Sequence, residues 1–200
     1  MTELTSNIKN AGAHLADTRT FVGVWDDLKP AKENAARIVD ENLLGMGTTI
    51  CAIAAVLGES GFDSLAVANV GDSRIYRCAD GRLTQVTEDH SLVADLVRTG
   101  ELTAEEAARH PQRNILTRAL GIEDELVVDT WELLPVVGDR YLLCSDGLFN
   151  ELTDERITEI LGQSVDLATA ANELVDRAVD AGGHDNVTVL VVDVVEAAET

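Results

Sequence analysis

One segment, Asp139–Glu151 with the sequence DRYLLCSDGLFNE, most limits how this chain can fold. Its short apolar run, Tyr141–Cys144, is typical of a buried strand. Ser145-Asp146-Gly147 then ends the run abruptly. Gly147 permits backbone angles that other residues resist, so we expect Asp146 at the end of the strand with its carboxylate turned into a cleft.

A second segment of the same kind lies near the end of the chain. Gly182-Gly183-His184-Asp185-Asn186 leads directly into the apolar run Val187–Val195, which predicts another core strand. If the two strands are neighbours, Asp146 and Asp185 form a site of hard oxygen ligands suited to Mg²⁺ or Mn²⁺. The alternative is that each Asp only stabilises a turn, because Asp and Gly are common turn residues.

Composition narrows the class of protein. The 200 residues suffice for one domain with a hydrophobic core, and 46% of them are hydrophobic. The net charge of −21 argues against binding to nucleic acid or to an anionic membrane surface. Cys51, Cys78 and Cys144 are widely spaced and form no CxxC motif, so we interpret them as buried thiols in a reducing compartment. The sequence shows no signal peptide and no membrane-spanning run, and we expect a cytoplasmic protein.

The order of the predicted elements indicates an α+β fold. Helices are expected over Thr2–Leu15 and Asp27–Leu43, followed by an antiparallel meander with an Asp80-Gly81 hairpin turn. The segment Asp89–Gly121 then interrupts the strands with small polar helices, and such an insertion is often a functional flap. Thr103, with Glu106 three residues on, predicts a capping box at one of these helices, and the last helix is expected over Pro111–Leu120. Two strands, two helices and a final strand complete the chain.

Two histidines lie in or near this flap. We interpret His90 and His110 as surface residues of loops.

Six segments resemble, in order and spacing, motifs of the metal-dependent Ser/Thr protein phosphatases of the PPM or type 2C family in their bacterial form. They are GMGTT at Gly45–Thr49, ANVGDSRIYR at Ala68–Arg77, LTQVTEDHS at Leu83–Ser91, HPQRNILTRALG at His110–Gly121, GDRYLLCSDGL at Gly138–Leu148 and GGHDNVTVLVVDV at Gly182–Val194.

The resemblance covers about residues 27–195. It implies an αββα sandwich of two antiparallel sheets flanked by helices, N-terminally incomplete. We therefore treat residues 1–200 as a single PPM-type phosphatase-like domain with a flap at about residues 89–121.

The same resemblance implies the chemistry. In the family, a water activated by two Mn²⁺ or Mg²⁺ ions hydrolyses phosphoserine or phosphothreonine. Asp146 and Asp185 match two ligands of the first metal. Asp89 matches a flap aspartate that, with the equivalent of Asp146, holds a third and weaker metal. Gly147 and Asn186 match supporting positions. No phosphoenzyme forms, so no catalytic residue is expected beyond the metal-activated water.

The chain departs from the family at its N-terminal side. It lacks the strand with an Arg for the substrate phosphate, and the V-x-D-G-x-G-G turn whose Asp bridges both metals. Full metal binding is therefore in doubt, and apolar sheet edges are expected to be exposed. Three interpretations remain: a fragment of an active phosphatase, which we favour, a non-catalytic binding or regulatory module, or an enzyme with a rebuilt site. In-frame DNA upstream of Met1 distinguishes the first two.

The expected partners follow from the resemblance as well. They are proteins phosphorylated on Ser or Thr, in bacterial signalling opposed to Ser/Thr kinases. No nucleic acid or membrane partner is expected, and we expect a monomer.

Overall fold

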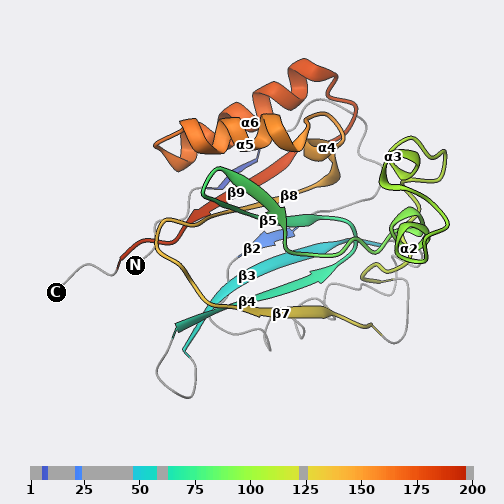
Figure 1. Cartoon of the computed structure of the whole chain (residues 1–200), viewed down its shortest axis with the longest axis horizontal. Coiled ribbons are helices and arrows are strands. Elements are labelled where there is room, and N and C mark those ends of the chain that lie inside the picture. Colours follow the sequence, from blue (N-terminus) through green and yellow to red (C-terminus); the bar gives the residue numbers. More distant parts are fainter. Residues whose placement is uncertain (1–5, 9–20, 24–46, 58–62, 122–125, 197–200) are drawn as a thin grey trace.

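The computed structural model describes residues 6–8, 21–23, 47–57, 63–121 and 126–196. Two sheets stack face to face, and α4, α5 and α6 cover the outer face of one of them (Figure 1). The α+β sandwich expected from the sequence is therefore confirmed. The helix predicted over Asp27–Leu43 lies outside the described residues.

The five-stranded sheet is antiparallel throughout, with the order β1-β9-β8-β5-β6. Its strands are β1 (Ser6–Ile8), β5 (Arg74–Ala79), β6 (Arg82–Gln85), β8 (Arg140–Cys144) and β9 (Thr188–Asp193). The hairpin between β5 and β6 turns at Asp80 and Gly81, both with positive φ, which confirms the turn that the Asp-Gly pair predicted.

The four-stranded sheet departs from the expected antiparallel arrangement. Its order is β2-β3-β4-β7, and β2 runs parallel to β3. The strands are β2 (Phe21–Gly23), β3 (Ile50–Leu57), β4 (Asp63–Val70) and β7 (Asp129–Leu133). The parallel pair is possible because the connection over residues 24–49 is long enough for a crossover, whereas β3 and β4 are joined by a short loop and pair antiparallel.

Two expectations for the N-terminal region are wrong. Ser6–Ile8 lies in a strand and pairs with β9, so the helix predicted over Thr2–Leu15 is not present there. The expected exposed edges are also covered in part, since β1 lies beside β9 and β2 beside β3. The physical reason is that the edge strand of a sheet offers unpaired N–H and C=O groups. A short segment can form hydrogen bonds with these groups even when the spacing of its apolar residues suggests a helix.

The core has two layers because β8 is buried on both faces. Tyr141 and Leu143 point between the sheets, whereas Leu142 and Cys144 point toward the helices. Alternate residues of a strand face opposite sides, so a continuous apolar run is what a central strand covered on both faces requires.

Three helices lie over the five-stranded sheet. They are α4 (Asp146–Phe149), α5 (Asp154–Gln163) and α6 (Leu167–Ala181). Thr153 and Asp166 cap the last two by accepting hydrogen bonds from backbone N–H groups, whereas α4 was not predicted. In the part of the chain that is described, no helix has the length and apolar character needed to cross a membrane.

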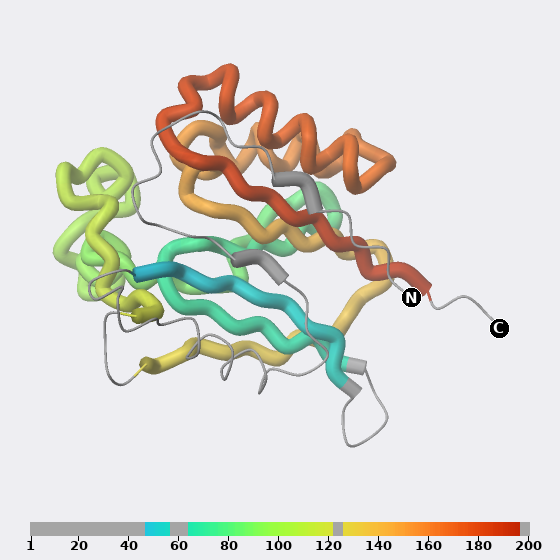
Figure 2. The backbone as a smooth tube through the Cα atoms, turned by 180° about the vertical axis from the view of Figure 1, so that it is seen from behind, coloured from blue at the N-terminus to red at the C-terminus, as the bar shows by residue number. Residues whose placement is uncertain are grey.

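The flap lies at one end of the sandwich, as the yellow-green segment of Figure 2 shows. It contains α2 (Leu92–Arg98) and α3 (Ala104–Ala107), and the predicted capping box of Thr103 and Glu106 is present. Pro111–Leu120 is not a helix, contrary to the prediction. Its residues Leu116 and Leu120 instead form isolated β-bridges, to Ser91 and Thr48, so tertiary pairing overrides the local preference.

A pair of valine substitutions tests the core between the sheets. Val67 of β4 is fully buried there, whereas Val165 is 96% exposed. We expect Val67→Ala to lower the free energy of unfolding by about 2 kcal/mol, since it removes two buried methyl groups. Val165→Ala makes the same chemical change in solvent and should have almost no effect. Urea denaturation measures both, and equal losses would contradict this description of the core.

Candidate active site

Asp146 and Asp185 lie at the same end of two neighbouring strands of the five-stranded sheet. β8 and β9 are antiparallel neighbours with Cys144 opposite Val189, as the sequence interpretation required. The chain therefore leaves β8 toward Asp146 where it enters β9 from Asp185. Burial, and next the charge of Asp185, raise the pKa of Asp146. A carboxylate whose charge raises the pKa of a neighbouring carboxyl group is close enough to share a cation with it.

Gly147 and Asn186 stabilise the two turns at this end of the strands. A Cβ atom at position 147 would overlap the carbonyl oxygen of Asn186, so only glycine fits against that turn. The backbone N–H of Asn186 donates to Oδ1 of Asp185 at 2.7 Å. The two residues thus support the positions of the candidate ligands on either side.

Asp72 is a third carboxylate at this end of the molecule, and our sequence analysis did not assign it a role. It follows Gly71 in the link between β4 and β5, and Gly71 has a φ of +105° with the Thr49 side chain where a Cβ would stand. Burial, then Asp146, then Asp89 raise the pKa of Asp72 to about 6. The sequence carries the same signal for Asp72 as for Asp146, since each is an aspartate beside a glycine at the end of a core strand.

Asp89 lies in the same region but is already paired. Arg74 donates from Nε to Oδ1 at 2.9 Å and from Nη2 to Oδ2 at 2.7 Å, and Gln85 donates to Oδ1 at 2.9 Å. Both side chains of the Arg74–Asp89 pair are largely buried. A bidentate pair of this kind engages both carboxylate oxygens of Asp89.

Arg74 links three elements at the floor of the site. Besides Asp89, it donates from Nη1 to the Tyr76 hydroxyl at 2.8 Å, and its guanidinium lies 3.6 Å from the centroid of the Phe149 ring in α4. These contacts make Arg74 a structural residue rather than a free phosphate contact. Arg118 is similarly engaged, with Asp129 at 2.7 Å.

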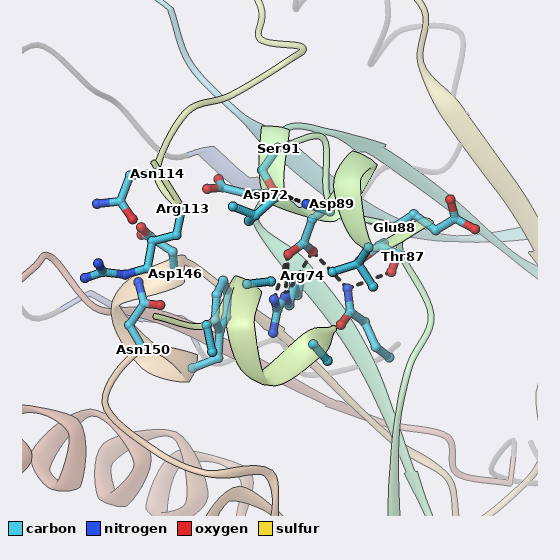
Figure 3. A pocket seen from close by; sticks show the side chains of 18 of the residues that line it. Asp72, Arg74, Thr87, Glu88, Asp89, Ser91, Arg113, Asn114, Asp146 and Asn150 are labelled. Carbon is cyan, nitrogen blue, oxygen red and sulfur yellow. Dashed lines mark hydrogen bonds and ion pairs between the residues drawn. The ribbon is translucent and has the colours of Figure 1, made fainter. Parts of the chain in front are cut away.

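A pocket of about 660 Å³ opens between the flap, α4 and the adjoining ends of β5 and β6. Asp72 and Asp146 line it together, with Arg113 and Asn114 from the flap and Asn150 from the end of α4 (Figure 3). This volume is within the range of small-molecule sites and suffices for a phosphorylated side chain. Asp185 is not among the lining residues.

His90 is buried, contrary to the interpretation of it as a surface residue. Its ring Nδ1 accepts from the backbone N–H of Gly71 at 3.0 Å, so the proton is on Nε2, which lies 3.0 Å from Oδ2 of Asp129. The backbone N–H of His90 also donates to the Gly71 carbonyl at 3.0 Å. His90 therefore holds the turn that carries Asp72. No signal in the sequence distinguished it from a loop histidine.

The three cysteines are buried and free, as predicted. Burial raises the pKa of the Cys51 thiol to about 12 and the pKa of Cys144 well above its ordinary value. A thiol with so high a pKa is not ionised at neutral pH and is a poor nucleophile.

The donor set at this end of the sheet fits a divalent cation of the Mg²⁺ or Mn²⁺ type, since it consists of carboxylate oxygens, two of them on the largely buried residues Asp72 and Asp146. Among the described residues, no three His, Cys, Asp or Glu side chains form a complete metal cluster. The arrangement is instead two pairs that share Asp146, one with Asp185 and one with Asp72.

Comparison with known proteins gives the family. The family model described as "Protein phosphatase 2C" matches residues 3–180. The chain belongs to the protein phosphatase 2C family.

The relatives are bacterial protein phosphatases. The chain is 45% identical over 152 residues to the serine/threonine phosphatase stp of Listeria monocytogenes, a match covering 76% of the chain and 58% of the relative. The crystal structure of the serine/threonine phosphatase PstP of Mycobacterium tuberculosis matches with a TM-score of 0.70 and 42% identity, covering 84% of this chain and 70% of that one. A structure of the PstP catalytic domain in complex with two manganese ions matches with a TM-score of 0.64 and 43% identity, covering 81% and 65%.

The stability of the chain at different pH values tests whether Asp72 is buried beside other carboxylates. Because the folded pKa of Asp72, about 6, exceeds its ordinary value of 3.8, the folded chain binds more protons between these values, and its stability falls as pH rises through them. Asp72→Asn stays neutral and avoids this loss. In excess chelator, we expect the variant to gain stability relative to the parent chain as pH rises from about 4 to about 7.

Urea denaturation across this pH range measures the difference. Asp180→Asn, at an exposed position of α6, controls for loss of charge alone. A stability difference between Asp72→Asn and the parent that is the same at every pH would contradict the burial of Asp72 among other carboxylates.

Proposed function

We propose that this chain is a metal-dependent protein phosphatase domain that hydrolyses phosphoserine and phosphothreonine in proteins. The observation that carries the proposal is the convergence of Asp72 and Asp146 at one pocket, with Asp185 beside Asp146, in a chain of the type 2C family. The chain spans 58% of the length of the Listeria relative, so the activity of that relative supports the proposal without deciding it.

The residues take distinct roles in this proposal. Asp146 and Asp185 hold one Mn²⁺ or Mg²⁺ ion, and Asp146 with Asp72 holds a second, more weakly bound ion. A bound ion supplies an acidified water for attack on phosphorus. Gly147 and Asn186 keep the carboxylates in place by the contacts described above.

Asp72 is a better candidate than Asp89 for the metal ligand on the flap side of Asp146. Both oxygens of Asp89 are engaged by Arg74, and a cation there would have to displace the guanidinium. Asp72, in contrast, makes no ion pair within the described part of the chain, and its pKa is raised by burial first and then by the charges of Asp146 and Asp89, all of which a bound cation would offset. We therefore infer that Asp89 acts by orienting Arg74 beneath the pocket.

Residues in the wall of the pocket are the candidates for binding the phosphate group of the substrate. Arg113 is exposed at the pocket, and Asn114 and Asn150 add amide donors nearby (Figure 3). A guanidinium exposed at a pocket is suited to bind the oxygens of a phosphorylated side chain. Phosphorylated proteins in the bacterial cytoplasm are the partners that this chemistry suits.

Hydrolysis of a phosphothreonine peptide by the 200-residue chain in saturating Mn²⁺ tests the proposal. Because the N-terminal family motifs are absent from the sequence, we expect slow turnover. It should stop in excess chelator and fall by about 100-fold in Asp146→Asn, the scale expected when a main electrostatic contact of a reaction is lost. Asp180→Asn, in the exposed part of α6, should match the parent chain.

Two outcomes would contradict the proposal. Turnover that continues in excess chelator, or that Asp146→Asn leaves unchanged, would exclude the assigned site. Peptide binding without any turnover would favour the alternative, a phosphatase-like binding or regulatory module.

A further inference from the structure

Ser145 connects the two segments that carry Asp146 and Asp185. It stands between the end of β8 and the start of α4 and is 5% exposed. Its hydroxyl donates to the carbonyl of Asn186 at 3.0 Å and accepts from the backbone N–H of Thr188 at 2.9 Å. Its backbone N–H also donates to the Thr188 carbonyl at 3.1 Å. One buried residue thus makes three hydrogen bonds to the entry of β9.

The direction of the Ser145 hydroxyl is unusual for its position. Ser145 is the N-cap of α4, where a serine oxygen normally accepts from the N–H groups of the first turn. Four of the five helices that the structure describes follow this rule, with Ser91, Thr103, Thr153 and Asp166 as their caps. Ser145 makes no such bond, and its hydroxyl serves the neighbouring strand instead.

The hydrogen bonds form a chain of contacts from Ser145 to the carboxylate of Asp185. The Ser145 hydroxyl holds the carbonyl of Asn186, and the N–H of Asn186 holds Oδ1 of Asp185. On the other side, Asp146 follows Ser145 directly. Since the two carboxylates repel each other, the segments need an attachment that keeps them together before a cation arrives.

We propose that Ser145 is a positioning residue that sets the separation of Asp146 and Asp185 for cation binding. This inference rests on the metal site of the proposed function and adds the residue through which the two ligands are held. Glu151 and His184 form another contact across the same junction, at 2.8 Å, but the His184 side chain is 82% exposed, and exposed ion pairs contribute little. Of these two side-chain contacts, the hydroxyl of Ser145 is the buried one, and it adds to the pairing of β8 with β9.

Titration of the 200-residue chain with Mn²⁺ alone, followed by calorimetry or by the electron paramagnetic resonance of free Mn²⁺, tests this role. We expect Ser145→Ala to weaken Mn²⁺ affinity by about 10-fold, since losing a partner that orients a metal ligand costs about 10–100-fold. Ser64→Ala, a buried serine at the far end of β4, is the matched control and should keep the affinity of the parent chain.

A double-mutant cycle separates positioning from general destabilisation. In the Asp185→Asn background, Ser145→Ala should change Mn²⁺ affinity by less than about twofold, because the ligand through which Ser145 acts is already lost. If Ser145→Ala does not fold, as judged by its thermal unfolding, Ser145→Cys takes its place, since a thiol is a weaker donor and acceptor of similar size.

Each outcome decides the inference. An unchanged affinity in Ser145→Ala, or an equal loss in Ser64→Ala, would overturn the role of Ser145 and leave the metal site intact. A loss that persists fully in the Asp185→Asn background would show that Ser145 does not act through Asp185. No Mn²⁺ binding by the parent chain would overturn the metal site and the inference with it.

Discussion

The antiparallel pairing of β8 with β9 is the interaction on which the site depends. It places Cys144 opposite Val189, so the turn after β8 and the turn before β9 meet at the same end of the two strands. The pairing is stable because β8 is buried on both faces, between the second sheet and the helices. Two carboxylates far apart in the sequence, Asp146 and Asp185, become neighbours as a direct result.

This convergence is unfavourable for folding by itself. Burial raises the pKa values of Asp72 and Asp146, and so does the charge of a neighbouring carboxylate, Asp146 for the first and Asp185 for the second. The ionised carboxylates therefore destabilise the fold near neutral pH. The surrounding contacts offset that cost: His90 holds the turn before Asp72, and Ser145 with Gly147 holds the turn beside Asp185. Local conflict of this kind, supported by a well-packed frame, is typical of functional sites.

The flap is attached to the sheets at both of its ends. At its start, Asp89 forms a bidentate pair with Arg74, which also contacts α4 through Phe149. At its far end, Arg118 pairs with Asp129 of β7, the same carboxylate that His90 contacts. The pocket wall is thus anchored to both sheets, and Arg113 is carried between the attachments with its side chain at the pocket.

Local sequence determined the elements whose signals are local. The run Tyr141–Cys144, the Asp80-Gly81 turn and the Thr103–Glu106 capping box each specify their structure through neighbouring residues, and all were predicted. Only the tertiary structure decided the parallel pairing of β2, the bridges of Pro111–Leu120, the burial of His90 and the place of Asp72, whose roles come from partners distant in the sequence. The physical reason is that hydrogen bonding, burial and charge act through space, so a side chain's chemistry is complete only when the fold supplies its neighbours.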